Sequence, residues 1–230
     1  AERLRGLRGR MSEGTLPQAS EFEAVAGDEG VALDPAVEPS DEQEQVRRIG
    51  GETYRFDAGC FFQINHALLG PLVEEGLRGT ADGGETALDL YSGVGLFTLP
   101  LARRFGRVVA VEGNPASVRY ARRNLSDSLL TNARVETDAV GDWLAHHARD
   151  LGRADFVLLD PPRAGAEPEA VRGIIDLRPA HVSYVSCDPA TLARDLRLLL
   201  DAGYRIDSLR AFDMFPQTHH VETVVHLLNS

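Results

Sequence analysis

The chain has 230 residues, of which 43% are hydrophobic, and this is enough to bury the core of one large α/β domain with an appendage. Its formal net charge of −11 argues against a general attraction to nucleic acid, although nine of the acidic residues fall between Glu21 and Glu44, where no basic residue occurs. No run of about 18 apolar residues is present and the Arg-rich start lacks an apolar signal-peptide core, so we expect a cytoplasmic protein without a membrane anchor.

Residues 1–50 differ in composition from the rest of the chain. They combine an Arg-rich start with Gly, Pro and acidic residues, which is typical of a solvated linker or of the remnant of a preceding domain with some strand. Because the chain begins at Ala1, we expect a processed product or a fragment of a longer protein. The main domain is predicted to cover residues 51–230.

Two cysteines, Cys60 and Cys187, lie far apart in the sequence and in unlike surroundings. Two are too few for a disulfide framework or an iron–sulfur cluster, and no set of ligands has zinc spacing, so neither a metal nor a cluster is predicted. All 24 basic residues are arginines, a side chain suited to phosphate contacts and base stacking. The acidic balance therefore weakens an RNA-binding interpretation without removing it.

A helix is predicted for residues 66–77, with Asn65 as its candidate N-cap. Its core face would present Leu68, Leu69, Leu72 and Val73. The residues Phe61, Phe62 and Gln63 precede this helix, and the local pattern by itself favours core positions for the two phenylalanines.

The segment Thr86–Phe97 resembles a strand, a Gly-x-Gly turn and the start of a helix. Gly93 and Gly95 allow the backbone to lie close to a ligand, and the following helix would offer unpaired N–H groups. Glu112 ends the next strand, where its carboxylate can accept hydrogen bonds from both ribose hydroxyls. A Gly-x-Gly turn is also common without a ligand. Because Thr98 replaces the third glycine of the dinucleotide fingerprint, the pattern favours an S-adenosylmethionine pocket over a nicotinamide site.

The alternation of strands and helices predicts a mostly parallel seven-stranded sheet of the Rossmann-like, class I methyltransferase type. Helices follow the first five strands, and the short link before the last strand predicts an antiparallel C-terminal hairpin. The expected strands are Ala87–Tyr91, Val108–Val111, Ala133–Thr137, Phe156–Leu159, His181–Ser186, Arg205–Leu209 and Thr223–Leu228.

Two further strand ends carry residues suited to chemistry. Asp160 follows the fourth strand before a rigid Pro-Pro pair, and its position favours the crevice of Gly93 over an ordinary turn. Cys187 follows the fifth strand, where Asp188 and Pro189 form a strong helix start. A helix N-terminus lowers the pKa of a thiol, so Cys187 is a candidate nucleophile, whereas Cys60 is expected to be a small buried hydrophobe.

Glu222 comes directly before the last strand and is a candidate general base, provided that the fold brings it over the end of the fifth strand. Two histidines, His219 and His220, precede it in the link. They have no partners at metal-ligand spacing, so surface positions are expected for them.

These motifs together resemble the RNA uracil-5-methyltransferase family, most closely its bacterial 23S ribosomal RNA members. The resemblance runs from about Tyr54 to the C-terminus. It rests on Phe-Phe-Gln-Ile-Asn (61–65), Asp-Leu-Tyr-Ser-Gly-Val-Gly (89–95), Asp-Pro-Pro-Arg (160–163), Ser-Cys-Asp-Pro-Ala-Thr-Leu-Ala-Arg-Asp (186–195) and Asp-Met-Phe-Pro-Gln-Thr-His-His-Val-Glu (213–222).

The resemblance implies that Cys187 is the nucleophile and Glu222 the proton acceptor in methylation of uracil C5. It implies that S-adenosylmethionine is the cofactor and that its pocket is lined by Gln63, Tyr91, Glu112 and Asp160, with Asp138 as a weaker candidate for the adenine amino group. The expected substrate is a uridine in RNA, ribosomal rather than transfer RNA, and the expected enzyme is a monomer.

Two departures from the family are visible in the sequence. Neither the N-terminal RNA-binding barrel nor the four cysteines of the iron–sulfur cluster of many ribosomal members can be found, so the chain is expected to be a C-terminal catalytic part. The alternatives left open are a transfer RNA uracil-5-methyltransferase, an inactive cofactor-binding module and an amino-methylating enzyme, which would carry Asn-Pro-Pro-Tyr at the position of Asp160.

Overall fold

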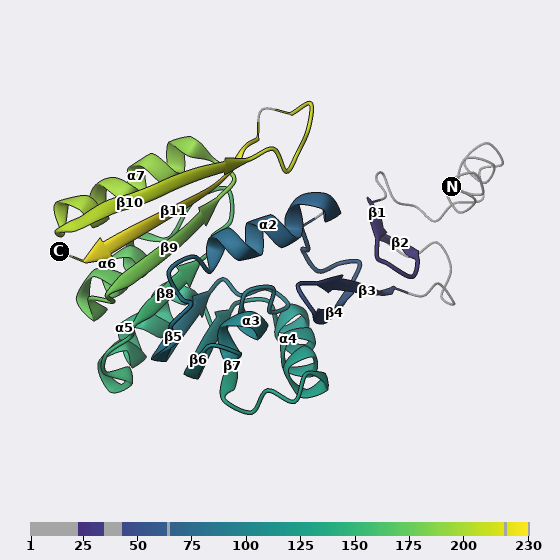
Figure 1. Ribbon diagram of the computed structural model, residues 1–230, viewed down its shortest axis with the longest axis horizontal. Coiled ribbons are helices and arrows are strands. Elements are labelled where there is room, and N and C mark those ends of the chain that lie inside the picture. The colour runs from purple at the N-terminus through teal and green to yellow at the C-terminus, as the bar shows by residue number, and fades with distance from the viewer. Residues whose placement is uncertain (1–22, 35–42, 64, 219, 230) are drawn as a thin grey trace.

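The computed structural model describes residues 23–34, 43–63, 65–218 and 220–229, and a seven-stranded sheet forms its centre (Figure 1). Across the sheet the strand order is β10-β11-β9-β8-β5-β6-β7. The strands are β5 (Gly84–Leu90), β6 (Phe105–Glu112), β7 (Ala133–Thr137), β8 (Phe156–Leu159), β9 (His181–Ser186), β10 (Tyr204–Phe212) and β11 (Glu222–Asn229).

The strands from β5 to β9 run parallel, and β11 lies antiparallel between β9 and β10. From β5 the chain moves outward through β6 to β7, then returns to β8 on the other side of β5 and continues to β9. The sheet therefore has its topological switch point between β5 and β8, where ligands of open α/β sheets bind. The predicted parallel sheet and C-terminal antiparallel hairpin are confirmed.

Both faces of the sheet are covered, and the strand sequences show why. Side chains alternate between faces along a strand, so β6 sends Val108 and Ala110 into one core and Val109 and Val111 into the other. The first core lies under α2, α3 and α4, and the second under α5, α6 and α7. Because both faces of these strands are buried, nearly every residue along them must be apolar.

Helices follow each of the first five strands of the sheet, as predicted. They are α3 (Thr98–Ala102), α4 (Pro115–Asp127), α5 (Val140–Leu151), α6 (Pro168–Leu177) and α7 (Pro189–Asp201), and α2 (His66–Gly76) precedes the sheet. The helix after the Gly-x-Gly turn begins later than expected. It starts only at Thr98, because the chain first makes turns through residues 91–97, and β6 begins at Phe105.

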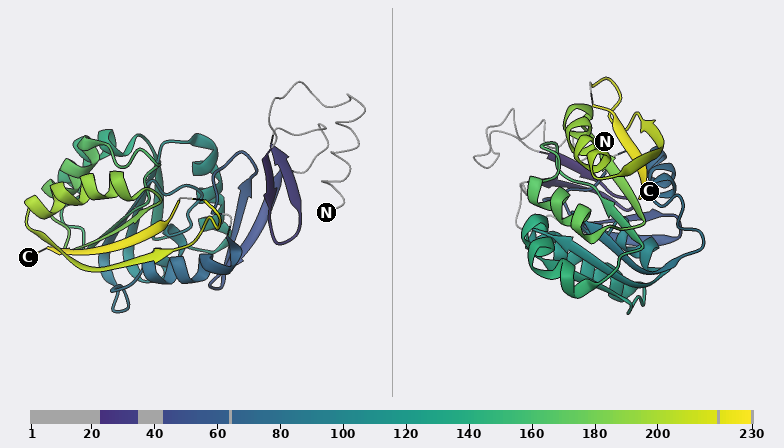
Figure 2. Two further views of the ribbon diagram at one scale, coloured as in Figure 1. Left: turned by 90° about the horizontal axis from the view of Figure 1, so that it is seen from above. Right: turned by 90° about the vertical axis from the view of Figure 1, so that its left-hand side faces the viewer.

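Two small hairpins precede the sheet, β1 (Glu23–Ala26) with β2 (Val31–Asp34) and β3 (Glu44–Ile49) with β4 (Glu52–Asp57). They lie at the end of the molecule opposite to the C-terminus (Figures 1 and 2). Asn124 of α4 joins β4 to the rest of the molecule, because its side chain bonds both the N–H and the carbonyl of Arg55. The division at residues 50 and 51 stays a prediction.

The segment before α2 differs from the prediction in two side chains. Phe62 is buried and stacks on Phe56 with ring centroids 4.4 Å apart, but Phe61 is 70% exposed. Asn65 is the N-cap residue of α2, as predicted, but its side chain forms no cap hydrogen bond; its Nδ2 donates instead to the carbonyl of Asp213 at 3.3 Å. The link before β11 crosses this point and offers that acceptor, which the local sequence does not show.

Candidate active site

A cavity of about 720 Å³ opens at the carboxyl ends of β5 and β8, at the switch point of the sheet. Its volume lies within the range of roughly 300–1,000 Å³ that small-molecule sites occupy. The walls come from the segment before α2, the ends of β5, β6, β8 and β9, and the start of β11. The polar side chains in the walls are Gln63, Tyr91, Ser92, Glu112, Asn114, Ser117, Asp160, Arg163, Glu167, Cys187 and Glu222.

The turn after β5 shapes one wall of the cavity through its backbone. Tyr91, Gly93 and Gly95 all have positive φ, at 61°, 53° and 95°. A Cβ on Gly93 would meet no atom within 4 Å, so at this residue the backbone itself borders open space. Gly95 turns the chain through a hydrogen bond from its N–H to the Ser92 carbonyl, but it does not line the cavity.

Glu112 is fixed beside this turn by two backbone groups. Its Oε2 accepts from the Gly93 N–H at 2.9 Å, and its Oε1 accepts from the Asn114 N–H at 2.6 Å. Each carboxylate oxygen can accept a further bond, so Glu112 keeps capacity for two ligand hydroxyls. Asp138 bonds the N–H of Ala139, which lines the cavity, while Asp138 itself does not.

Some buried polar atoms in the cavity walls have no hydrogen-bond partner. Among the described residues, Gln63 Oε1, Ser92 Oγ and Glu222 Oε2 are buried without a hydrogen-bond partner, and all three residues line the cavity. A buried polar atom left unpaired costs about 1–3 kcal/mol, so three of them in one cavity indicate a polar ligand. Together with the Glu112 carboxylate, which can accept two further hydrogen bonds, and the open backbone at Gly93, these residues fit a nucleoside such as S-adenosylmethionine.

The register of the antiparallel pair places Glu222 beside Cys187. Thr223 of β11 pairs with Ser186 of β9, so the next residue outward on each strand is Glu222 and Cys187 respectively. Glu222 is 1% exposed, and burial raises its pKa to about 7, while a hydrogen bond from the Gln63 side chain opposes the shift. A carboxylate with this pKa is well matched to proton removal near neutral pH.

The electrostatics of Cys187 differ from the sequence-based expectation. The pKa of its thiol is raised by burial and then by the neighbouring carboxylates of Glu222 and Asp160, and Arg163 opposes them. The pKa of Asp160 is itself raised well above its usual value by burial, by Glu222 and by Asp89. The expected lowering of this pKa by the helix N-terminus was wrong in direction, because burial of the thiol and, after it, the carboxyl groups of Glu222 and Asp160 raise the pKa.

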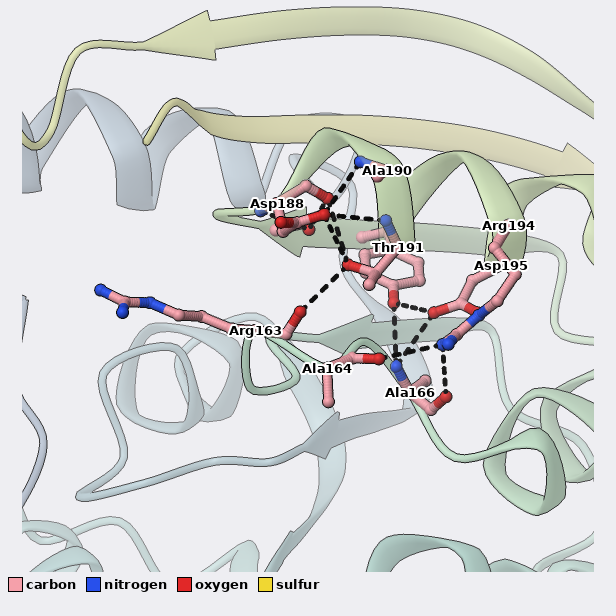
Figure 3. A network of polar contacts seen from close by, with 10 residues as sticks. Arg163, Ala164, Ala166, Asp188, Ala190, Thr191, Arg194 and Asp195 are labelled. Atoms are coloured by element: carbon pink, nitrogen blue, oxygen red, sulfur yellow. Dashed lines mark hydrogen bonds and ion pairs between the residues drawn. The ribbon is translucent and has the colours of Figure 1, made fainter. Parts of the chain in front are cut away.

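A network of polar contacts centred on the buried Asp195 joins the loop after β8 to α7, the helix that begins just beyond Cys187 (Figure 3). Asp195, 1% exposed, accepts from the Tyr184 hydroxyl at 2.7 Å and the Ala166 N–H at 2.9 Å. Arg194 donates to the carbonyls of Ala164 and Ala166, both at 3.1 Å. The loop that holds Asp160 is thereby fixed to the helix that positions the thiol.

Seven of the nine site residues named from the sequence line this one cavity: Gln63, Tyr91, Gly93, Glu112, Asp160, Cys187 and Glu222. Gly95 and Asp138 lie next to lining residues without reaching it, and His219 is outside the described residues. Sequence reasoning missed Ser92, Asn114 and Glu167, of which Glu167 accepts a hydrogen bond from the Tyr91 hydroxyl. Only Asn114 had a local signal, since Pro115 follows it as the first residue of a helix.

The strand order, with its inserted antiparallel strand, and the cavity at the switch point define a class I S-adenosylmethionine-dependent methyltransferase fold. The chain belongs to the tRNA (uracil-5-)-methyltransferase family, whose model matches residues 40–230. The resemblance inferred from the motifs is confirmed.

Individual relatives agree with this assignment. A 23S rRNA (uracil(1939)-C(5))-methyltransferase RlmD of Shewanella frigidimarina is 41% identical over 201 residues, which are 87% of this chain and 42% of the relative. An uncharacterized RNA methyltransferase of Thermotoga maritima is 39% identical over 80% of this chain and 41% of the relative. The chain thus spans less than half the length of the curated relatives that it matches.

Solved structures show the same fold. The Pyrococcus abyssi tRNA (uracil-54, C5)-methyltransferase in complex with S-adenosyl-L-homocysteine has a TM-score of 0.68 and 35% identity, covering 81% of this chain and 45% of that one. A putative S-adenosylmethionine-dependent methyltransferase from Streptococcus mutans has a TM-score of 0.65 at 13% identity, covering 86% of this chain and 58% of that one, and so supports the fold alone. No helix in the described part of the chain is long and apolar enough to cross a membrane.

Proposed function

We propose that the chain is the catalytic part of an RNA uracil-5-methyltransferase that methylates a uridine of 23S ribosomal RNA. Cys187 and Glu222 lie one residue beyond the Ser186–Thr223 pair of β9 and β11 and line the same cofactor-sized cavity, and this is the observation that supports the proposal best. An inactive cofactor-binding module has no need for a thiol and a buried carboxylate in this arrangement, and an amino-methylating enzyme has no need for the thiol.

Each residue then has a step to perform. The Cys187 thiolate adds to C6 of uracil, forming a sulfur–carbon bond and moving the electron pair of the C5–C6 double bond into an enolate. S-adenosylmethionine supplies the methyl group that C5 takes up. Glu222 removes the C5 proton, the electron pair of that C–H bond restores the double bond, and Cys187 leaves as the thiolate.

Gln63, Tyr91, Gly93, Glu112 and Asp160 are the residues that we propose to hold the cofactor. Glu112 would accept the ribose hydroxyls, and the Gly93 backbone allows close approach. Gly95 would contribute by shaping the turn. Asp138 would act indirectly by fixing Ala139 at the cavity wall.

The substrate uracil must leave its base stack to reach the cavity. Phe61, 70% exposed at the mouth of the cavity, offers an aromatic face for a base. The curated relatives named for 23S rRNA favour ribosomal RNA, while the tRNA enzyme of Pyrococcus abyssi makes transfer RNA the second candidate. We propose that the protein is a monomer and works in the cytoplasm.

The decisive experiment traps the covalent intermediate. The Glu222→Gln variant is mixed with S-adenosylmethionine and either 23S rRNA fragments or transfer RNA, and protein joined to RNA is sought on a denaturing gel and by mass spectrometry. Because proton removal is blocked after methyl transfer, we expect an adduct that maps to Cys187 and to one uridine. The RNA that forms the adduct identifies the substrate class.

Matched controls define the result. The double variant Glu222→Gln/Cys187→Ser should form no adduct, whereas Glu222→Gln/Cys60→Ser should retain it, because Cys60 is buried in the core. Cofactor and RNA binding are measured separately by calorimetry and filter retention. If both bind and no adduct forms with either RNA, the covalent mechanism is refuted.

A further inference from the structure

Arg163 is the only basic side chain among the described residues that line the cavity. The same wall carries Glu112, Asp160, Glu167 and Glu222. The Arg163 side chain is exposed, and no carboxylate of the described residues lies within ion-pair distance of its guanidinium. Other arginines near carboxylates in this chain form such pairs, for example Arg194 with Asp195 at 2.8 Å. A cation that has no carboxylate partner among the described residues, in an acidic cavity, points to a role in the chemistry of that cavity.

The backbone of Arg163 is held firmly, although its side chain forms no ion pair with a carboxylate of the described residues. The Thr191 hydroxyl donates to the Arg163 carbonyl at 3.2 Å, and the next residues of the loop are bound by Arg194 and Asp195. We call Tyr184, Thr191, Arg194 and Asp195 the α7 clamp. Figure 3 shows the guanidinium extending away from the clamp, with no marked interaction to the residues drawn.

Gly165 shows how closely the loop is seated on the clamp. A Cβ at this residue would lie 2.5 Å from Arg194 Nη2 and 2.7 Å from Asp195 Oδ2, and its φ is +80°. Only glycine therefore permits this contact without displacing the clamp. The fixed loop therefore determines the backbone position from which the Arg163 side chain extends.

The α7 helix also fixes Cys187. Asp188 caps it by accepting from the N–H groups of Ala190 and Thr191, both at 2.9 Å, and Cys187 is the residue before this cap. One helix thus holds both the residue that carries the thiol and the loop that carries Arg163, so the two backbone segments are fixed relative to each other.

We propose that Arg163 is the counter-ion of the Cys187 thiolate and that the α7 clamp positions it for this role. This inference rests on the proposed function, in which the thiolate is the attacking group. Cys187 faces Glu222 from β11 and Asp160 from the end of β8, and both carboxyl groups disfavour a negative charge on sulfur. Arg163 opposes them through its charge and through a hydrogen bond to the thiol.

The test measures the ionisation of Cys187 without RNA or cofactor. The folded chain is alkylated with iodoacetamide between about pH 6 and pH 10, and peptide mass spectrometry follows Cys187 separately from the buried Cys60. In the Arg163→Gln variant we expect the midpoint to rise by about one pH unit and alkylation below the midpoint to slow about tenfold.

Three variants separate charge from structure. Arg163→Lys should recover most of the shift because it retains the charge. Thr191→Val should raise the midpoint by less than Arg163→Gln, since the loop loses one anchor while the cation remains. Arg172→Gln removes an exposed arginine of α6 that pairs with Glu169 outside the cavity, and should leave the midpoint unchanged.

An unchanged or lowered midpoint in Arg163→Gln, with an unaltered circular dichroism spectrum, would overturn the inference. If Arg163→Gln does not fold, the comparison of Thr191→Val with Arg172→Gln decides, and equal midpoints refute the inference. The result is independent of methyl transfer. A raised midpoint together with no RNA adduct in Glu222→Gln therefore means that the counter-ion is real and the proposed function is wrong.

Discussion

Asn124 offers a quantitative test of how the turn after β5 is held in place. Its side chain is fully buried in α4 and makes three hydrogen bonds across the fold. The amide oxygen accepts from the Arg55 N–H at 2.9 Å, and the amide nitrogen donates to the carbonyls of Arg55 and Val94, both at 3.0 Å. Val94 lies between the two glycines of the turn, so one side chain joins β4, α4 and the cavity wall.

Replacing Asn124 by Ala removes all three hydrogen bonds. The Arg55 N–H and the carbonyls of Arg55 and Val94 then lose their side-chain partner. Each bond contributes about 1 kcal/mol net, so the free energy of unfolding should fall by about 3 kcal/mol. For a domain of this size that corresponds to a Tm lower by roughly 6–12 °C. Because Val94 adjoins Gly93, we also expect weaker binding of S-adenosylhomocysteine.

Urea unfolding followed by circular dichroism gives the free energy of unfolding. An m-value equal to that of the parent shows that unfolding of the variant exposes the same amount of surface. Ser126→Ala is the matched control, because Ser126 is exposed on the same helix, and a change within about 0.5 kcal/mol is expected for it. A loss below about 1 kcal/mol in Asn124→Ala would refute the reasoning, since it would mean that water replaces the three bonds without cost.

Two further predictions concern the same turn and strand. Burial raises the pKa of Asp89 to about 7, so the stability from its neutral form is present below pH 4 and is lost as the pH rises through 7. Asp89→Asn should therefore match the parent below about pH 4 and be more stable than the parent by about 4 kcal/mol at pH 9 in urea titrations, and equal stability of variant and parent at both pH values would contradict this. Gly95→Ala forces a side chain into φ +95° with its Cβ 3.1 Å from Leu99 Cδ1. It should lower the free energy of unfolding by about 1–3 kcal/mol in the same assay, and an unaffected variant would show that the turn relaxes freely.

The sequence by itself determined the layers of the fold and the ends of its strands. Strands buried on both faces must be apolar almost continuously, so their positions are visible in the chain order, and the polar residues that follow them mark one edge of the sheet. Asp188 and Pro189 likewise define the start of α7 through local backbone chemistry, and both hydrogen bonds of that cap are present. These features depend on neighbours within a few residues.

Only the tertiary structure decided which charges meet. The insertion of β11 beside β9 brings Glu222 to Cys187. Burial of the thiol, and then the charges of Glu222 and Asp160 from two other strand ends, raise the thiol pKa that the local helix was expected to lower. The role of Asn124 was likewise decided by the tertiary structure. In the sequence it is an ordinary polar residue of a helix, but its three hydrogen-bond partners come from β4 and the turn after β5. Burial, pKa and long-range hydrogen bonds depend on segments far apart in the chain, and no local pattern contains them.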